Sequence, residues 1–432
     1  MSSFRSSQPS TSLRSRTVAA ASALALLSAT ACGSDPQSPQ LRAEVDYQPA
    51  SLSSATAAED VVAAGTRFGA QTLEALAAGE NLVVSPASLT TALAMLAEAA
   101  EGPAAAELEE LLGAAGESRT EAFSALQAAV REYDGDPAAV QEDDLPERPL
   151  LHLANQLVTQ DGVDPDDDLL ETLASAYDAG LVTTDFAQQE SKDLLDSWVD
   201  EHTGGLIEKS GVQAPDDRIQ FVLQNAVVLA AQWQSPFSES ATAEGDFITG
   251  TGASVRTDLM QQRLFASYTE YDGAQAVRLP YTEGFAMDVV LPAEGQDPAA
   301  ITGEDWLEIS AALGEESAGA EVDLMLPRVE ISSSEDLIDL LLELGLEATV
   351  AGDDLNKLAP GTRLSQVAHQ TVMRVDEDGT VAAGVTEIVG LTSGTLEEPV
   401  QLHVDRPYAL HIVHTETDWP LFMGVVYDPT AE

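Results

Sequence analysis

The sequence predicts one mixed α+β domain, and three observations lead to this fold class. Apolar residues at helical spacing dominate the first half of the chain, whereas strand-like segments dominate from residue 247 onward. No internal repeat and no second domain boundary appears along the 432 residues. The hydrophobic content of 44% is ample for one large core.

The first 31 residues have the pattern of a bacterial-type signal peptide. They contain three arginines and no acidic residue, and the arginines precede an apolar run over residues 18–27. Cys32, the single cysteine, follows the small residues Ala29-Thr30-Ala31, as in a lipobox. We expect lipid attachment to Cys32; the alternative is an incidental cysteine after an ordinary signal peptide. The protein is therefore expected to be anchored to a bacterial cell envelope or secreted.

Residues 32–57 are rich in Ser, Pro, Gln and Ala, a composition typical of disordered linkers. We therefore expect a disordered tether there and a folded domain over residues 58–432. Ser85-Pro86 predicts a helix start, with Ser85 as the cap and Pro86 in the first turn. The apolar run over 220–232 predicts a central strand buried on both faces. Further helices are expected at 60–77, 86–99, 103–112, 119–133, 165–177, 190–202 and 336–344, and further strands at 81–84, 151–159, 181–185, within 247–291, and at 402–404, 408–415 and 421–427.

The charge of the chain excludes some partners. It has 73 acidic residues against 19 Lys and Arg, which gives a formal net charge of −54. Such a surface repels nucleic acid and anionic lipid, so we expect no nucleic-acid partner and no membrane contact except through the lipid anchor. The same charge favours solubility and basic partners.

The stretch from Val375 to Gly394 begins as a strand and continues in small residues without turn chemistry. Its even-numbered positions from Thr380 to Thr386 share one face of a strand and are small. The stretch can be a strand in waiting, exposed now and able to join a sheet later. The alternative is a small-residue surface linker.

Six separated blocks of the chain resemble those of the serpins, the serine protease inhibitor family, from about Ala58 to Pro429. The resemblance is to a bacterial member with a lipoprotein-type signal peptide. It implies a single domain with a large central antiparallel-rich sheet, further sheets, about eight to nine helices and an exposed reactive loop. The blocks are 81–96, 196–207, 225–237, 326–346, the hinge pattern from Glu377 to Thr386, and the closing pair 405–408 and 421–424.

The resemblance implies a suicide-substrate inhibitor of serine proteases and no catalytic activity of its own. A protease cuts the loop, and the N-terminal side of the loop then inserts into the main sheet and carries the acyl-linked protease with it. The alternative is a non-inhibitory binding protein with the same fold. The hinge residues implied by the family pattern are Glu377, Gly379, Thr380, Ala382, Ala383, Gly384 and Thr386.

The bond to be cut has several candidates. Counting forward from Glu377, as in the family, places it between Ser393 and Gly394. Counting back from Pro407 gives Leu396 instead, and Leu391 is a third candidate. No Lys or Arg lies between Val375 and Gln401, so an elastase-, subtilisin- or chymotrypsin-like target is expected rather than a trypsin-like one.

The resemblance also implies two polar clusters beneath the sheet. A shutter would join Ser85, Ser88, Asn225 and His369, and a breach would join Trp233, Arg328 and Glu377. The alternatives are unrelated polar residues, an ordinary core tryptophan and a surface ion pair of little energy. We expect a monomer without a cofactor. We also expect no metal site, because His411 and His414 point to opposite sides of one strand.

Overall fold

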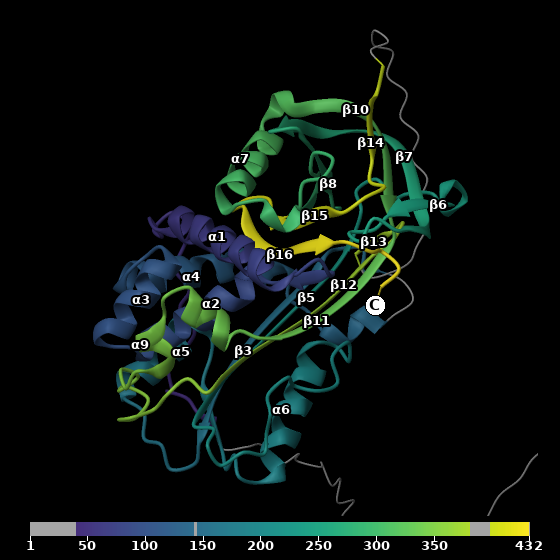
Figure 1. Ribbon diagram of the computed structural model, residues 1–432. Helices are drawn as coiled ribbons and strands as arrows, with labels where there is room; N and C mark the ends of the chain where they lie inside the picture. The colour runs from purple at the N-terminus through teal and green to yellow at the C-terminus, as the bar shows by residue number, and fades with distance from the viewer. Residues whose placement is uncertain (1–39, 142–144, 381–397, 432) are drawn as a thin grey trace, which may run out of the picture. The chain divides into compact units, whose positions relative to one another are not determined.

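The computed structural model describes residues 40–141, 145–380 and 398–431, which belong to one compact unit (Figure 1). The helices of the described residues are α1 (Ala58–Leu76), α2 (Pro86–Ala99), α3 (Gly102–Leu112), α4 (Gly116–Val130), α5 (Asp167–Tyr177), α6 (Gln189–His202), α7 (Gly303–Gly314), α8 (Ile338–Glu343) and α9 (Glu347–Ala351). Most of the helices gather at one end of this unit, whereas α6 and α7 lie against the sheets, an arrangement that fits the α+β domain predicted from the sequence.

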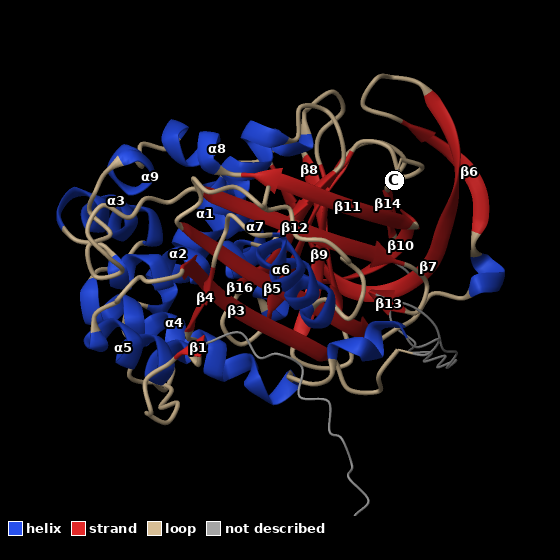
Figure 2. Ribbon diagram, turned by 90° about the horizontal axis from the view of Figure 1, so that it is seen from below, coloured by secondary structure: helices blue, strands red, loops and turns tan. Residues whose placement is uncertain are grey.

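The main sheet has seven strands in the order β1-β4-β3-β5-β13-β12-β11. Helix α6 lies across one face of it (Figure 2). The long central strand β5 pairs with β3 in antiparallel register from Leu150↔Ala230 to Thr159↔Phe221. The strands are β1 (Gln40–Leu41), β3 (Leu150–Gln160), β4 (Leu181–Thr184), β5 (Phe221–Gln232), β11 (Val329–Asp336), β12 (Gln366–Val375) and β13 (Gly379–Thr380).

A second sheet has nine strands in the order β14-β10-β7-β8-β9-β15-β16-β2, with β6 paired to β7. The strands β9, β15 and β16 are buried along their whole lengths, which fits their mainly apolar sequences, although β9 also buries Asp288 and β15 buries His411 and His414. The strands are β2 (Leu82–Val84), β6 (Ala243–Ile248), β7 (Ser254–Tyr271), β8 (Ala274–Pro280), β9 (Phe285–Leu291), β10 (Gly319–Pro327), β14 (Val400–His403), β15 (Tyr408–His414) and β16 (Trp419–Val426).

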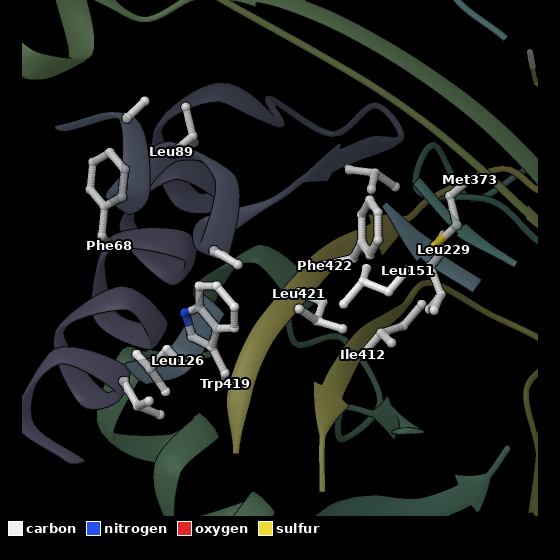
Figure 3. Close-up of a cluster of buried hydrophobic side chains, with 14 of the residues drawn as sticks. Phe68, Leu89, Leu126, Leu151, Leu229, Met373, Ile412, Trp419, Leu421 and Phe422 are labelled. Carbon is white, nitrogen blue, oxygen red and sulfur yellow. The ribbon is translucent and has the colours of Figure 1, made fainter. Parts of the chain in front are cut away.

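The core joins helices α1, α2 and α4 to the inner faces of both sheets (Figure 3). Helix α2 is central to it, since every residue of α2 except Glu98 is buried. The predicted cap is confirmed, because Ser85 Oγ accepts from the Ser88 amide at 3.3 Å and Pro86 opens the first turn. This cap fixes the direction in which Ser85 leaves β2 toward the main sheet.

The prediction of a disordered tether up to residue 57 is wrong for residues 40–57, which we call the strap. Its first residues form β1, which pairs with Leu181 and Val182 of β4. Arg42 then forms an ion pair with Asp178 at 2.6 Å. Backbone pairing and this ion pair fix a segment whose composition alone favours disorder. The strap is held further by the bonds Gln48 N to Ser175 O and Ala50 N to Ser124 Oγ.

Candidate functional site: the hinge and the sheet gap

The hinge starts where β12 ends and the chain turns back through residues 376–378. The Asp376 amide donates to the Gly379 carbonyl at 3.1 Å, and Asp376 Oδ1 accepts from the amides of Asp378 and Gly379. An aspartate that bonds amides two and three residues ahead stabilises a tight turn. Burial raises the pKa of Asp376, although these two amides act against the rise. The turn directs β13 back along β12.

Strand β13 already lies inside the main sheet, between β5 and β12. Gly379 and Thr380 pair with Gln232 and Ala231 of β5, and Thr380 also pairs with Val375 of β12. The expectation that the small-residue part of this stretch is exposed is therefore wrong for Gly379 and Thr380, which are buried between the two strands.

Gly379 is required by the close approach of β13 to β5. A Cβ atom at this position would lie 2.1 Å from the Ala231 carbonyl oxygen and 2.9 Å from Gln232 Cα. Both contacts are with backbone, which cannot rotate away as a flexible side chain can. Only glycine fits at this place in the sheet.

Thr380 anchors β13 from below. Its Oγ1 lies 2.6 Å from the Tyr281 hydroxyl, and both side chains are buried. The Tyr281 ring stacks on Trp233 with centroids 4.5 Å apart and planes 8° apart. Trp233 in turn donates from Nε1 to the Asp376 carbonyl at 2.9 Å and from its amide to the Asp378 carbonyl at 2.8 Å. Trp233 therefore stabilises the turn through two hydrogen bonds, and it also packs against Tyr281, which bonds to Thr380.

Glu377 and Arg328 meet as the resemblance implies. Arg328 donates from Nε to Oε2 at 2.7 Å and from Nη2 to Oε1 at 2.6 Å, and the Thr242 hydroxyl donates to Oε1 as well. Glu377 is only 3% exposed, so this pair is more than a surface ion pair. Burial favours the neutral acid, but Arg328 and Thr242 outweigh it and lower the pKa of Glu377.

Below β13 the strands β5 and β12 separate. They pair directly only at Val222↔Gln366 and Leu223↔Val367. From these pairs up to β13, residues 224–230 of β5 face residues 368–374 of β12, and no strand within the described residues lies between them. We call this interval the sheet gap.

The segment after α6, residues 203–215, covers one side of the sheet gap, and we call it the cover. Gln370 on β12 accepts from the Gly211 amide at 2.5 Å and donates to the Lys209 carbonyl at 3.0 Å. Gln366 accepts from the Gln213 amide at 2.9 Å. The neutral amides of β12 therefore hold the cover in place.

Three of the four predicted shutter residues meet beneath the sheet. His369 Nε2 accepts from the Ser85 amide at 3.0 Å, Ser85 Oγ donates to the Leu421 carbonyl at 2.6 Å, and the Ser88 amide donates to Ser85 Oγ. An acceptor at Nε2 places the ring proton of neutral His369 on Nδ1. Burial lowers the pKa of His369 to about 4, which keeps the ring neutral.

Asn225 does not join this cluster, so this part of the shutter prediction is wrong. Its side chain donates to Asn155 Oδ1 on the neighbouring strand β3, away from Ser85 and His369. The reason is the width of the sheet gap, which separates β5 from β12 at this level. Two residues that sequence reasoning missed complete the cluster instead: Thr371 donates to the Val83 carbonyl at 2.6 Å, and Ser333 accepts from the Val83 amide at 3.0 Å.

Some missed residues carried a usable signal. Thr371 follows His369 by two positions and therefore shares its face of β12. Tyr281 and Thr242 carried none, because their positions at the hinge follow from the tertiary fold. The remaining predicted residues lie outside the described part of the chain: Cys32, Ala382, Ala383, Gly384, Thr386, Leu391, Ser393, Gly394 and Leu396.

The described ranges contain neither a candidate metal site nor a helix that could span a membrane. No group of three or more His, Cys, Asp or Glu side chains there could hold a metal ion. No helix within those ranges has the length and apolar content needed to cross a membrane.

In this protein the start of a loop is paired between two strands of the main sheet. Comparisons with known proteins identify the family to which this arrangement belongs. A family model described as Serpin (serine protease inhibitor) matches residues 63–429, so the chain belongs to the serpin family. Members of this family are generally protease inhibitors and not catalysts.

Among similar proteins, Iripin-3 of Ixodes ricinus is 28% identical over 359 residues, which cover 81% of this chain and 89% of the relative. The leukocyte elastase inhibitor of Bos taurus is 29% identical over 393 residues, which cover 86% and 100%. The native thermophilic serpin tengpin has a TM-score of 0.72 at 22% identity, with 90% and 97% covered. Human thyroxine-binding globulin complexed with its hormone has a TM-score of 0.73 at 23% identity, with 87% and 100% covered. The two structural likenesses show the fold alone.

Proposed function

We propose that this protein is an irreversible suicide-substrate inhibitor of serine proteases. The observation that carries the proposal is β13, which already occupies the top of the sheet gap and pairs with both flanking strands. A cut further along the loop would release the chain beyond Thr380. That chain would then extend β13 down the gap and carry the attached protease away from the hinge.

The register of β13 supports this proposal. If its pairing continued down the gap, residue 382 would lie between Leu229 and Met373, two buried core side chains. Only a small side chain would fit between such neighbours without overpacking, and the sequence supplies Ala382. In the same register, Thr386 would lie between Asn225 and His369.

Insertion to Thr386 would unite the predicted shutter in the cleaved state. A threonine hydroxyl between Asn225 and His369 can bond to either side chain. Asn225 Oδ1 is buried and receives no bond of acceptable geometry in the described structure, so a new donor would stabilise it. The driving force for inhibition is then added strand pairing together with satisfaction of buried polar groups.

The test is an incubation of the protein with elastase-, subtilisin- and chymotrypsin-like proteases, followed by denaturing gel electrophoresis. We expect a covalent complex that survives SDS, and a cut that mass spectrometry maps to Leu391, Ser393 or Leu396. Cleaved protein should also melt at a higher temperature than intact protein. Absence of a complex with every protease, together with equal melting, would show a non-inhibitory binding protein instead.

We also propose that residues 1–31 direct export and that Cys32 carries a lipid anchor. The basis is the basic, apolar and small-residue order of that segment. Cys32→Ser should move the protein from the membrane fraction to the soluble fraction while complex formation with protease stays normal. An unchanged distribution between the fractions would refute the anchor.

A further inference from the structure

Strand β3 has an outer edge that is only half paired. It pairs with β5 over residues 150–159, whereas β4 covers its other side only from Leu157 to Gln160. Figure 2 shows β3 toward the margin of the main sheet, with β4 and β1 near one end of it. Among the described residues, no strand lies beside Leu150–Gln156 on this side. An open strand edge is a template for another strand.

The backbone groups that point outward along this edge can be identified. The Gln160 amide donates to Gln220 across the β3–β5 pair at 3.0 Å. Backbone direction alternates along a strand, so the even-numbered residues of β3 bond to β5. Leu151, Leu153 and Asn155 therefore turn their N–H and C=O groups away from β5. Leu151 is buried, whereas Leu153 and Asn155 are partly exposed, so the accessible part of this edge lies at these two residues.

A cavity of about 330 Å³ lies along these same residues, and we call it the edge slot. Its two walls belong to the two faces of the sheet. His152 faces α6, where its Nε2 lies 3.0 Å from His202 Nδ1, and Trp198 packs on His202. Asn155 faces α4, where it donates to Gln127 at 3.4 Å. A strand in the slot would direct alternate side chains to these walls.

The charged residues that line the edge slot are Asp134, Asp178 and Arg131, whereas the helices on either side of it are acidic. Helix α6 carries five carboxylates and a single lysine, and α5, whose end lines the slot, carries three carboxylates and no basic residue. At the rim, Asp178 is already paired with Arg42 and Arg131, and half-exposed Asp134 bonds to His152. With the net charge of −54, the field at the slot favours a basic occupant.

We propose that residues 151–155 of β3 bind an extended, Lys- or Arg-containing segment of a partner protein by strand addition. The segment would need roughly five residues, at about 3.3 Å each, to run along residues 151–155 and bond to the backbone groups of Leu153 and Asn155. It would lie in line with β4 and end where β4 begins at Leu181. This site is on the opposite side of β5 from the sheet gap, so it is separate from the proposed inhibitory mechanism.

The test uses a fluorescent, acetylated and amidated hexapeptide of alternating Val and Lys, with binding followed by fluorescence anisotropy. Leu153→Pro removes one outward N–H and leaves the β3–β5 pairing untouched, because proline is tolerated at an open edge. Leu153→Ala is the matched control, since it shortens the same side chain and keeps the N–H. We expect saturable binding to the natural protein and the alanine variant, and at least tenfold weaker binding to the proline variant.

Two altered peptides test the proposal on the unmodified protein. These tests remain valid even if the proline variant does not fold. A peptide N-methylated on alternate residues, so that one edge cannot donate, should lose binding, and a Val-Glu peptide should not bind. Equal binding of the N-methylated peptide would overturn strand addition. Equal binding of the Val-Glu peptide would overturn the basic partner. A dimer that the proline variant abolishes, without peptide binding, would replace the partner by a second copy of this chain.

Discussion

Replacing Gly379 by alanine tests whether β13 belongs in the sheet. The new Cβ would lie 2.1 Å from the Ala231 carbonyl oxygen, whereas ordinary contact begins near 3.4 Å. The backbone must therefore yield by more than 1 Å. The chain can keep β13 in place and bear the strain, or it can expel β13 and lose its bonds.

Either route has a similar free-energy cost. Overpacking of a fixed backbone costs about 1–3 kcal/mol. Expulsion breaks the Thr380–Tyr281 bond and leaves a buried tyrosine hydroxyl without its partner, which also costs about 1–3 kcal/mol. The variant should therefore lose about 1–3 kcal/mol of unfolding free energy, and expulsion should also change the fluorescence of Trp233.

The assay is unfolding in urea, followed by circular dichroism and by tryptophan fluorescence, to which Trp233 contributes together with the three other tryptophans. Gly65→Ala is the matched control, because a Cβ at Gly65 in helix α1 would meet its nearest atom at 3.6 Å. That variant should be neutral or slightly more stable, since alanine favours helix. An unchanged urea midpoint and unchanged fluorescence in Gly379→Ala would refute the placement of β13 between β5 and β12.

The remaining predictions concern the same site. Thr380→Arg should convert the inhibitor into a substrate, seen as cleaved protein with free protease on a gel, because a guanidinium cannot be buried against Tyr281 without a partner; normal complex yield would refute this. Arg328→Ala should lower the unfolding free energy by about 1–3 kcal/mol, since it leaves the buried Glu377 carboxylate without its cation; an unchanged urea midpoint would contradict it. His369 has a pKa of about 4 when folded and an ordinary value of 6.5, so the unfolded chain binds the extra proton and stability falls as the pH drops from about 7 to 4. His369→Gln should reduce that slope by about 1 kcal/mol per pH unit between pH 6 and 5, and an unchanged slope in urea titrations would count against a buried neutral ring.

Local patterns predicted most of the helices and strands, and the family pattern predicted the Glu377–Arg328 pair. Such features depend on periodicity, caps and short motifs that the sequence displays directly. The partner of Asn225 could not be predicted from such local patterns. Its partner Asn155 lies 70 residues away, and only the register of β3 against β5 brings the two together.

The strap and β13 show a second limit of sequence reasoning. Residues 40–57 have the composition of a linker, yet Arg42 and the edge of β4 order them. Small residues at 379 and 380 are compatible with exposure and with insertion, and the width of the sheet gap decides between the two. Composition describes what a segment can bury by itself, whereas its partners decide whether it is ordered.

The cover over the sheet gap has a consequence for the response to salt. Gln370 and Gln366 hold it through neutral amide bonds to backbone groups. Ions screen interactions between exposed charges within about 10 Å at 0.1 M ionic strength, but they leave such dipolar bonds almost unchanged. On a chain with 73 acidic residues, a latch of opposite charges would weaken as salt rose. With glutamines in that place, added salt should leave the bonds between the cover and β12 almost unchanged, whereas it should weaken the Lys192–Asp196 ion pair that holds Ser210 of the cover to α6.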